Sequence, residues 1–491
     1  MLDQTNLADL LSDPSLLLDK AYVAGEWLDA DNGATFDVLN PARGDVLVSL
    51  PDMGRAETAR AIDAAHAAQK EWAAKTGKER AAVLRRWYDL MVENADDLGR
   101  ILTAEMGKPF AEGKGEILYG ASFVEWFAEE AKRVYGETIP GHQPDKRLLV
   151  IKQPVGVVAS ITPWNFPNAM IARKVGPALA VGCAFVSKPA KQTPLSALAM
   201  AVLAERAGVP KGVLSVVTSA SSSKIGEEFC SNPKVRKITF TGSTEVGRIL
   251  MRQSAEQIKK TSMELGGNAP FIVFDDADLD AAVEGAMMSK YRNNGQTCVC
   301  ANRIYVQAGV YDAFAEKLAK ATAAMKLGDG LEDGVTTGPL INADAVAKVE
   351  EHIADALAKG AEIKTGGKRS NLGGTFFEPT VLTGVTRDMK VTYDETFGPV
   401  APLFKFDDES DVIEQANDTI YGLASYFYAK DLGRVWRVAE ALEYGMVGIN
   451  TGLISTEVAP FGGVKQSGLG REGSSHRVDD YLEMKYLCMS V

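Results

Sequence analysis

Residues 155–188 read VGVVASITPWNFPNAMIARKVGPALAVGCAFVSK, and this stretch decides the fold. Its β-branched and apolar start, 155–161, predicts a strand, followed by a Pro- and Asn-containing loop, a helix over 168–180 and a second strand over 184–188. The alternation continues with a helix at 193–207, a strand at 213–217, a helix at 222–230 and a strand at 237–241. Strands that alternate with helices predict a parallel, doubly wound sheet, which binds ligands at the carboxyl ends of its strands.

A second α/β segment is expected from residue 269 to about 461. It contains predicted strands at 271–274 and 303–306 and predicted helices at 277–291, 311–325 and 343–359. The 491 residues exceed what one ordinary core holds, so the boundary between two domains is placed at 264–269. A cleft between domains is a common place for chemistry.

The remaining segments are expected to complete these two domains. Short strands and turns are predicted for 21–44, and helices for 56–76, 77–94, 95–105 and 115–135, whose aromatic residues Phe123, Trp126 and Phe127 are expected to pack in a core. Residues 1–17 resemble a loosely attached lead-in. Residues 148–151 and 481–491 have the alternating pattern of sheet edges that could pair with another subunit. The predicted division is a dinucleotide-binding domain at 1–135 and 155–264, a catalytic domain at 265–465, and oligomerisation strands at 136–154 and 480–491.

Charge and composition exclude several classes of partner. The chain has 53 Lys and Arg against 65 Asp and Glu, and its net charge of −12 disfavours nucleic acid or an anionic membrane. The longest near-apolar run, residues 176–186, is too short to span a bilayer, and the acidic start lacks the cationic region of a secretory signal. Five scattered cysteines do not form a disulfide framework, which favours a reducing, cytoplasmic location.

A metal site and a histidine base are not expected. The four histidines, His66, His142, His352 and His476, lie far from the cysteines in sequence, although proximity in space stays open. The Cys298-x-Cys300 pair lacks the further ligands that a structural zinc site requires.

Cys298 is the candidate nucleophile. It lies in NNGQTCVCAN, residues 293–302, six positions after Arg292, and no acidic residue occurs between Lys290 and Arg303. Nearby positive charge stabilises a thiolate, so these neighbours predict a lowered thiol pKa. The alternative is a buried structural cysteine, and the local sequence does not separate the two.

Three further motifs offer candidate ligand contacts. The segment 468–473, GLGREG, matches G-x-G-x-x-G, but no strand precedes it, so the match is interpreted as accidental. The segment 242–247 stands between a predicted strand and a helix, where free N–H groups can face a phosphate. Lys188 and Lys191 follow a strand of the same sheet and could meet ribose and phosphate groups. Glu264, beside paired glycines, is a candidate general base or an ordinary surface glutamate.

These motifs together resemble the aldehyde dehydrogenase superfamily. TPWNFP at 162–167, KPA at 188–190, FTGS at 240–243, ELGG at 264–267, GQTC at 295–298 and ETFGP at 395–399 stand in the family's order and spacing, and the resemblance covers residues 21–486. It implies an α/β fold of two doubly wound domains, a cofactor domain and a catalytic domain, with a small β oligomerisation element. It also implies that Cys298 is the nucleophile, Glu264 the base and Asn165 the oxyanion donor. The cofactor contacts that it implies are Thr162, Pro163, Trp164, Lys188, Ala190, Lys191, Gly242, Ser243, Leu265, Glu395 and Phe397.

Within the superfamily the chain is most similar to the succinate-semialdehyde dehydrogenases, in MIARK at 170–174, in residues 292–303 and in residues 459–468. The resemblance implies that Arg173, Arg292 and Ser455 hold the distal carboxylate of the substrate. Two guanidinium groups near one site can clamp a carboxylate and also favour a thiolate. The expected reaction is oxidation of succinate semialdehyde to succinate. The alternatives are glutarate semialdehyde, a cofactor-free ester or thioester hydrolase, and a catalytically silent structural protein.

The expected cofactor is NADP, with NAD as a second cofactor. Many relatives that prefer NAD carry Glu where this chain has Lys191. Losing a carboxylate removes a partner of the ribose 2′-hydroxyl, and gaining a cation suits a 2′-phosphate. The expected assembly is a homo-oligomer, a dimer or a tetramer.

Cys300 lies two residues after Cys298 and is a candidate redox partner of it. We hypothesise that oxidants join the two cysteines in an inactivating disulfide. Peroxide should then inactivate Cys300→Ala more slowly than the unchanged protein, and identical inactivation of the two would exclude the disulfide.

Overall fold

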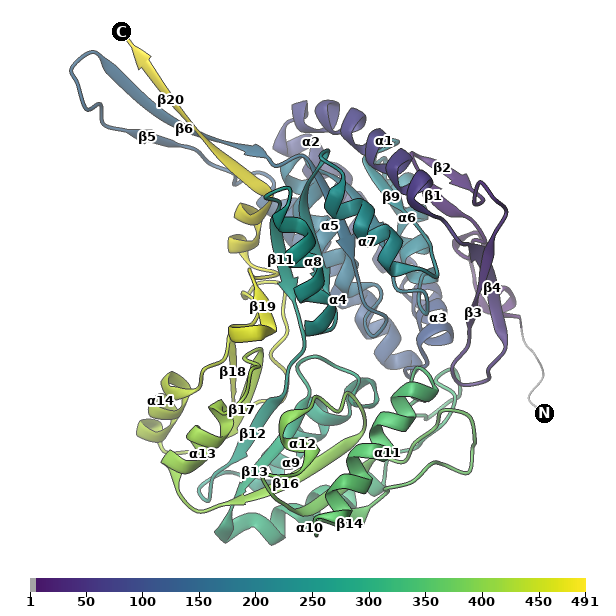
Figure 1. Ribbon diagram of the computed structural model, residues 1–491, viewed down its shortest axis with the longest axis vertical. Helices are drawn as coiled ribbons and strands as arrows, with labels where there is room; N and C mark the ends of the chain where they lie inside the picture. Colours follow the sequence, from purple (N-terminus) through teal and green to yellow (C-terminus); the bar gives the residue numbers. More distant parts are fainter. Residues whose placement is uncertain (1–5) are drawn as a thin grey trace.

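The larger sheet has eight strands, in the order β19-β11-β10-β7-β8-β9-β1-β2, in the computed structural model, which describes residues 6–491 (Figure 1). The inner strands β11, β10, β7, β8 and β9 run parallel, and β1, β2 and β19 are antiparallel additions at the two edges. The strands are β1 (Ala21–Val23), β2 (Glu26–Leu28), β7 (Val157–Ile161), β8 (Ala184–Lys188), β9 (Leu214–Val216), β10 (Val235–Thr241), β11 (Lys260–Glu264) and β19 (Gly468–Leu469). Because β8 and β9 lie on one side of β7 and β10 and β11 on the other, the predicted doubly wound sheet is confirmed.

The register brings the predicted ligand loops to one edge of this sheet. Ile161 at the end of β7 pairs with Lys188 and with Phe240, and Thr241 at the end of β10 pairs with Glu264. The carboxyl ends of four neighbouring strands are therefore level. The strand order changes direction between β7 and β10, and ligands bind at such a reversal.

The second sheet has seven strands within residues 6–491, in the order β14-β15-β16-β13-β12-β17-β18, and all but β14 run parallel. The strands are β12 (Ala269–Val273), β13 (Ala301–Gln307), β14 (Glu362–Thr365), β15 (Thr380–Val385), β16 (Val400–Phe406), β17 (Ala424–Tyr428) and β18 (Met446–Ile449). The chain passes from β11 to β12 through residues 265–268 alone. The amino ends of the second sheet therefore face the carboxyl ends of the first (Figure 1).

Helices cover both sheets, and most lie within a few residues of their predicted bounds. Those of the first part are α1 (Arg55–Ala74), α2 (Gly77–Glu93), α3 (Ala95–Met106), α4 (Phe110–Glu130), α5 (Ala169–Val181), α6 (Leu195–Ala207), α7 (Ser222–Ser231) and α8 (Thr244–Ala255). Those of the second are α9 (Leu279–Tyr291), α10 (Tyr311–Ala323), α11 (Ala343–Ala358), α12 (Lys390–Tyr393), α13 (Glu409–Asn417) and α14 (Leu432–Ala441). Phe123 and Phe127 are fully buried where α4 packs on α2 and α5, and Trp126 is half-buried.

The expectation of a loose lead-in is wrong for residues 6–17, and residues 1–5 lie outside the described part. Leu7, Leu11 and Leu16 are buried. The Asp97 carboxylate accepts hydrogen bonds from the backbone N–H groups of Ser12 (3.0 Å) and Asp13 (2.8 Å). Apolar anchors spaced along an irregular segment have no helical or strand period, so the sequence pattern gave no sign of this packing.

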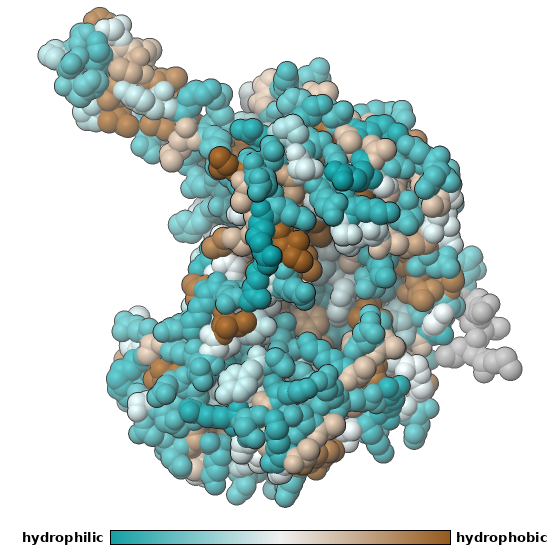
Figure 2. All heavy atoms as spheres, viewed as in Figure 1, coloured by the Kyte–Doolittle hydropathy of each residue, from teal (hydrophilic) through white to brown (hydrophobic). Residues whose placement is uncertain are grey.

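An antiparallel arm projects from the body of the molecule. It consists of β5 (Glu137–Ile139), β6 (Lys146–Pro154) and β20 (Leu482–Ser490), in the order β20-β6-β5, and it is the long extension at the upper left of Figure 1. Brown apolar residues line parts of its surface in Figure 2, and the exposed ones include Met484, Tyr486 and Met489. The two short strands β3 (Thr35–Leu39) and β4 (Val46–Pro51) form a separate hairpin.

No helix within residues 6–491 has the length and apolar character that a bilayer crossing requires.

Candidate functional site

The loop before β13 turns sharply to present Cys298. After α9 ends at Tyr291, Asn293 (φ 52°), Asn294 (φ 54°) and Gly295 (φ 74°) are successively left-handed. Asparagine and glycine tolerate this region best, which explains the Asn-Asn-Gly sequence. The Asn294 amide donates to the Gly338 carbonyl (2.8 Å), so the turn is anchored to the neighbouring chain segment.

Cys298 lies between two cavities. One, of about 350 Å³, is bounded by the carboxyl edge of the first sheet and the loop before β16. The other is a narrow pocket of about 10 Å³ that shares Tyr119, Phe166, Arg292 and Ser455 with an outer chamber of about 670 Å³. A thiol in this position can meet a ligand from either side.

The 350 Å³ cavity collects most of the predicted cofactor residues. Its lining contains Pro163, Trp164, Gly242, Ser243, Leu265, Glu395 and Phe397 together with Asn165 and Cys298. It also contains Asp344, Ala345, Lys348 and Thr396, which the sequence analysis did not single out. Asp344, Ala345 and Lys348 come from α11, on the far side of the cleft. No local sequence pattern predicts that this helix lines the cavity.

Three contacts fix the walls of this cavity. The Glu395 carboxylate accepts a hydrogen bond from the Gly267 N–H (3.1 Å), and burial raises its pKa to about 7. The Trp164 ring meets the Phe397 ring edge-on, with centroids 5.5 Å apart. Ser243 caps α8 by accepting from the Val246 N–H (3.3 Å), which leaves the start of the helix facing the cavity, a suitable place for a phosphate. The residues present therefore fit the nicotinamide half of a dinucleotide.

The other predicted cofactor residues lie along the same sheet edge, outside that lining. The Thr162 N–H donates to the Lys188 carbonyl (3.2 Å), and Ala190 is half-buried. Lys188 is buried and donates to the Ser222 hydroxyl (2.8 Å), and burial lowers its pKa to about 8. Lys191 is exposed. A basic group at the surface beyond a buried one suits the adenosine end of a dinucleotide.

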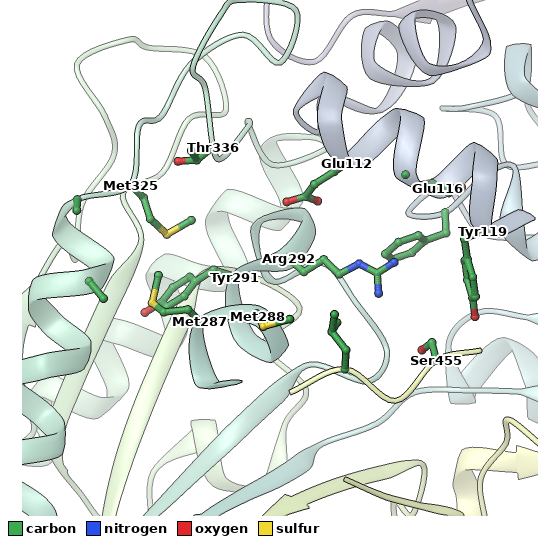
Figure 3. A pocket seen from close by; sticks show the side chains of 15 residues that line it. Glu112, Glu116, Tyr119, Met287, Met288, Tyr291, Arg292, Met325, Thr336 and Ser455 are labelled. Atoms are coloured by element: carbon green, nitrogen blue, oxygen red, sulfur yellow. The ribbon is translucent and has the colours of Figure 1, made fainter. Parts of the chain in front are cut away.

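Arg173, Arg292 and Ser455 meet around the narrow pocket on the other side of Cys298. Arg173 comes from α5, Arg292 from the end of α9 and Ser455 from the segment after β18. Figure 3 shows Arg292 reaching toward Tyr119, with Ser455 below them. The structure therefore brings together the three residues proposed to hold a carboxylate.

Arg173 is held rigidly. It is 1% exposed, and its guanidinium lies 4.4 Å from the Phe461 ring centroid and 4.9 Å from that of Phe123. It donates to the Tyr119 hydroxyl and pairs with the Glu472 carboxylate at 3.2 Å. Its Nε is buried without a hydrogen-bond partner, which leaves a donor for a ligand.

Arg292 is held more loosely. Its guanidinium lies 4.8 Å from the centroid of the Phe166 ring, and within residues 6–491 no carboxylate forms a salt bridge with it. A cation that has no anionic partner beside the nucleophile is available to an anionic ligand.

Glu264 is buried at the end of β11, so the interpretation as a surface glutamate is wrong. Its Oε2 has no hydrogen-bond partner, and it lines neither cavity beside Cys298. Burial, and then the nearby Glu472 carboxylate, raise the pKa of Glu264 well above its usual value. A carboxylate of raised pKa can accept a proton near neutral pH.

Glu472 joins three cations in a buried cluster that the sequence analysis missed. Its carboxylate lies 2.5 Å from Lys174, 3.2 Å from Arg173 and 3.5 Å from Arg477. It belongs to the GLGREG segment, which forms the short strand β19 and no helix, so the interpretation of that motif match as accidental agrees with the structure. The sequence of that segment does not indicate that Glu472 pairs with Lys174 of α5, 298 positions away.

The expected low pKa of the Cys298 thiol is wrong. Burial raises it to about 12, and only then does Arg173 lower it, while Glu395 and Glu264 raise it further. The local sequence shows the absence of acidic neighbours, but it does not show that two distant carboxylates fold against the thiol. The nucleophile is therefore a thiol that must lose its proton as it reacts.

Asn165 holds the nucleophile loop directly. Its amide donates to the Gln296 carbonyl at 3.0 Å, two residues before Cys298. An amide NH₂ has a second donor, so one N–H remains for a developing oxyanion.

Cys300 and His352 lie apart from the reacting thiol. Cys300 is fully buried and its thiol donates to the Lys290 carbonyl (3.3 Å). The disulfide with Cys298 stays a prediction, and it would require Cys300 to turn away from Lys290. His352 is buried on α11, where its Nδ1 contacts the Thr396 hydroxyl (3.0 Å), and it lines neither cavity beside Cys298.

Comparison with known proteins yields close matches along nearly the whole chain. Residues 27–487 match the model of the aldehyde dehydrogenase family. The chain is 69% identical to a glutarate-semialdehyde dehydrogenase of Pseudomonas aeruginosa over 98% of this chain and 99% of that protein. It is 66% identical to an NADP-dependent succinate-semialdehyde dehydrogenase of Escherichia coli, with 98% and 100% covered. The crystal structure of a succinate-semialdehyde dehydrogenase from Burkholderia pseudomallei superposes with a TM-score of 0.97 at 68% identity, with 98% of this chain and 100% of that chain covered.

Alkylation of Cys298 by iodoacetamide should report its raised pKa. We expect the rate to rise with pH throughout the range from about 7 to 10, without a plateau, because the thiolate fraction keeps growing. Arg173→Met should slow the reaction by about threefold or more, because Arg173 lowers the thiol pKa and each pKa unit changes the thiolate fraction about tenfold. Mass spectrometry of the Cys298 peptide measures both effects.

Arg292→Met is the matched control, since Arg292 lines the same pocket but is not among the groups that shift the thiol pKa. A plateau near neutral pH, or equal slowing in the two variants, would contradict this account.

Proposed function

The chain belongs to the aldehyde dehydrogenase family, and from this premise we propose that it oxidises succinate semialdehyde to succinate with NADP, and with NAD as a second cofactor. The observation that carries the proposal is the meeting of Cys298 with Arg173, Arg292 and Ser455 around one pocket. An aldehyde at the thiol would then have its distal carboxylate among two guanidinium groups and a hydroxyl. The succinate-semialdehyde dehydrogenase of Escherichia coli, 66% identical, supports this substrate.

The two arginines proposed to bind the carboxylate differ in how firmly they are held. Arg173 is fixed by Glu472, Tyr119 and aromatic rings, whereas Arg292, within the described residues, forms no salt bridge and has one cation–π contact, with Phe166. A planar guanidinium can bind a carboxylate through two parallel hydrogen bonds. Fixing one end of the substrate turns attack at the other end into an effectively unimolecular step.

In the first half of the proposed reaction, the Cys298 sulfur attacks the aldehyde carbon, and the thiol proton passes to solvent water. The oxygen becomes an oxyanion, which the second N–H of the Asn165 amide and the Cys298 backbone N–H would stabilise. The 350 Å³ cavity beside Cys298, with Trp164, Leu265 and Glu395 in its lining, would hold a nicotinamide, which would supply the hydride acceptor as the carbonyl re-forms. The carbon is left as a thioester on Cys298.

In the second half, Glu264 serves as the general base for water. Its ionised form takes the proton of the water that attacks the thioester, and the raised pKa makes this carboxylate a stronger base than an exposed one. The carboxylic acid leaves, and the thiol regains a proton. Because the Glu264 carboxylate lines neither cavity in this conformation, its side chain must turn toward Cys298, or a water must bridge the two.

NADP is the proposed preferred cofactor because the far end of the site is basic. Lys188 and Lys191 follow β8, and Ser222 bonds to Lys188 at the start of α7. No carboxylate follows Lys-Pro-Ala to bind a free 2′-hydroxyl, whereas an exposed Lys191 suits a 2′-phosphate.

Glutarate semialdehyde is the second candidate substrate. The glutarate-semialdehyde dehydrogenase of Pseudomonas aeruginosa is 69% identical to this chain, and the outer chamber of about 670 Å³ gives a longer chain room beside Arg292. One methylene changes binding by only about 1–3 kcal/mol, so the two activities should overlap.

The proposed assembly is a cytoplasmic homo-oligomer, a dimer or tetramer, formed through the arm. Within the described residues β20 pairs only with β6, so its other edge is an unpaired row of backbone groups. Met484 is 72% exposed and Tyr486 57%. Apolar residues on a projecting strand with one unpaired edge are typical of an interface between subunits.

Absorbance of the reduced cofactor, with purified protein and succinate semialdehyde, tests the reaction. We expect turnover with NADP or NAD, and in Arg173→Ala a KM for the semialdehyde raised by about tenfold or more, because a charged hydrogen bond in a buried site is lost. An uncharged aldehyde of similar length is the control and should be affected far less. If no aldehyde reduces either cofactor while an ester still acylates Cys298, the protein is the hydrolase of the alternative interpretation. If neither reaction occurs, it is the catalytically silent structural protein.

Lys191→Glu should change the cofactor preference. We expect the KM for NADP to rise by about tenfold or more, because a carboxylate repels the 2′-phosphate, while the KM for NAD stays level or falls. Initial rates with each cofactor measure the change. Lys234→Glu, at a surface lysine paired with Asp63 (2.7 Å), makes the same charge change away from the site. An unchanged ratio of the two KM values in Lys191→Glu would remove Lys191 from the cofactor site.

Met484→Asp/Tyr486→Asp should dissociate the assembly. Two charges on the exposed face of β20 would have to be buried in an interface, which is unfavourable. Light scattering after gel filtration at micromolar concentration measures the mass. Leu372→Asp, at an exposed leucine outside the arm, is the control and should keep the oligomer. A monomeric unchanged protein would contradict the assembly.

A further inference from the structure

Three charged side chains at the entry to α4 contact both loops that carry the reacting groups: Lys108, two residues before the helix, and Glu112 and Glu116 within it. Glu112 and Glu116 are four residues apart and therefore lie on one face of α4. Figure 3 shows Glu112 and Glu116 on the same helix, above Arg292. We propose that these three are positioning residues, which fix the Asn165 amide relative to the Cys298 sulfur. The inference rests on the proposed acylation of Cys298.

Lys108 holds the backbone of Asn165. Its ammonium donates to the Asn165 carbonyl (2.7 Å) and to the Glu116 carboxylate (2.6 Å), and it lies 3.8 Å from the centroid of the Phe166 ring. The side chains of Lys108 and Glu116 are 0% exposed. Burying such a pair is costly, and its hydrogen bonds to the loop compensate for lost water.

Glu116 holds the start of α5. Its second oxygen accepts from the N–H groups of Asn168 (2.9 Å) and Ala169 (3.2 Å), which are free donors at the first turn of that helix. A carboxylate there is also favoured by the helix dipole. The segment from Asn165 to Ala169 is therefore held at both ends from one side of α4.

Glu112 holds the loop of the nucleophile. Its carboxylate accepts from the Asn293 N–H (2.8 Å), within the left-handed turn before Cys298. The Asn293 amide in turn donates to the Asn165 carbonyl (3.0 Å), the same oxygen that Lys108 binds. Two donors occupy both lone pairs of this oxygen and fix the plane of the peptide.

These hydrogen bonds join the Asn165 loop, the loop before Cys298 and the entry to α4 to one another. Asn165 donates to the Gln296 carbonyl, Asn293 donates to Asn165, and α4 holds each loop from behind. A donor placed for an oxyanion is effective only at about 2.7–3.1 Å from that oxygen, and a misplacement of about 1 Å costs about 10²-fold in rate. The α4 contacts therefore bear on the attack step and on every substrate, charged or not.

Two variants of the full-length protein isolate these contacts. Lys108→Met/Glu116→Gln removes the bond to the Asn165 carbonyl without leaving an unpaired buried charge, and the Gln oxygen can still cap α5. Glu112→Met removes the bond to Asn293, and Glu112→Gln, whose amide oxygen can accept it, is the conservative rescue. We expect the first two variants to slow acylation of Cys298 by p-nitrophenyl acetate about 10- to 100-fold, and Glu112→Gln to recover most of the rate.

Alkylation by iodoacetamide separates positioning from general damage, because it displaces iodide at a saturated carbon and forms no oxyanion. We expect it to stay within about threefold in all variants. With semialdehyde and cofactor, kcat should fall while KM changes by less than about threefold. Glu105→Gln is the matched control, since Glu105 is also buried and accepts from the Leu195 (2.7 Å) and Ser196 (2.9 Å) N–H groups at the start of α6, and these hydrogen bonds hold neither Asn165 nor the turn before Cys298.

Equal slowing of acylation and alkylation would reduce the three residues to a structural role, and unchanged acylation would overturn the inference outright. If the unchanged protein oxidises no carboxylated aldehyde but the variants still lose acylation selectively, the proposed substrate fails and the positioning role stands.

Discussion

The connection between the two sheets is the constraint on which the site depends. Only residues 265–268 separate the end of β11 from the start of β12. So short a link forces the carboxyl edge of one sheet against the amino edge of the next, and the loops of both edges into one seam. Its glycines allow the approach: a Cβ on Gly267 would lie 2.4 Å from the Cys298 carbonyl oxygen, and one on Gly266 would lie 2.9 Å from a Glu395 carboxylate oxygen. Larger residues would push the nucleophile loop and Glu395 out of place.

Partial or full burial in the seam sets the protonation of the reacting groups: Glu264 is buried, and Cys298 and Glu395 are half-buried beside the 350 Å³ cavity. Burial is the largest cause of the raised pKa values of Cys298, Glu264 and Glu395. Because these groups hold their protons more tightly than in water, the thiolate and the carboxylates that form when they ionise are stronger bases than their exposed counterparts. Removing water also strengthens each remaining hydrogen bond and ion pair, so the few donors aimed at the oxyanion count for more than they would in solvent.

The sequence predicted the positions of the site residues better than their environment. Strand periodicity placed the 162–167, 188–191 and 242–247 segments after parallel strands, and parallel strands end at a common edge, so their meeting follows from topology alone. The end of β11 was harder to recognise, because its sequence, KTSME, is mostly polar.

What the sequence could not supply was contact between distant segments. Lys174 pairs with Glu472, which lies 298 positions away in a segment whose glycines suggested a different motif. Lys108 donates to the Asn165 carbonyl, 57 positions away. The prediction for the Cys298 thiol failed for the same reason. Ten residues of sequence show which charges are near along the chain, but burial, Arg173 and two carboxylates from distant segments, Glu264 and Glu395, set the pKa of the thiol.

The charge balance of the buried cluster explains how an acidic chain presents a cationic pocket. Glu472 is shared among Arg173, Lys174 and Arg477, and within residues 6–491 the one salt bridge of Asp480 is to Arg477, at 2.8 Å. Glu264 would complete the balance if it were ionised, but its raised pKa favours the neutral form. One positive charge is then left without an anion inside the cluster. Arg173 is the cation that faces the pocket, and Arg292 adds a second charge there, so the excess is directed at the place where a substrate carboxylate would lie. The net charge of −12 is that of the whole chain, and the pocket has the opposite sign because cations from distant segments lie around it.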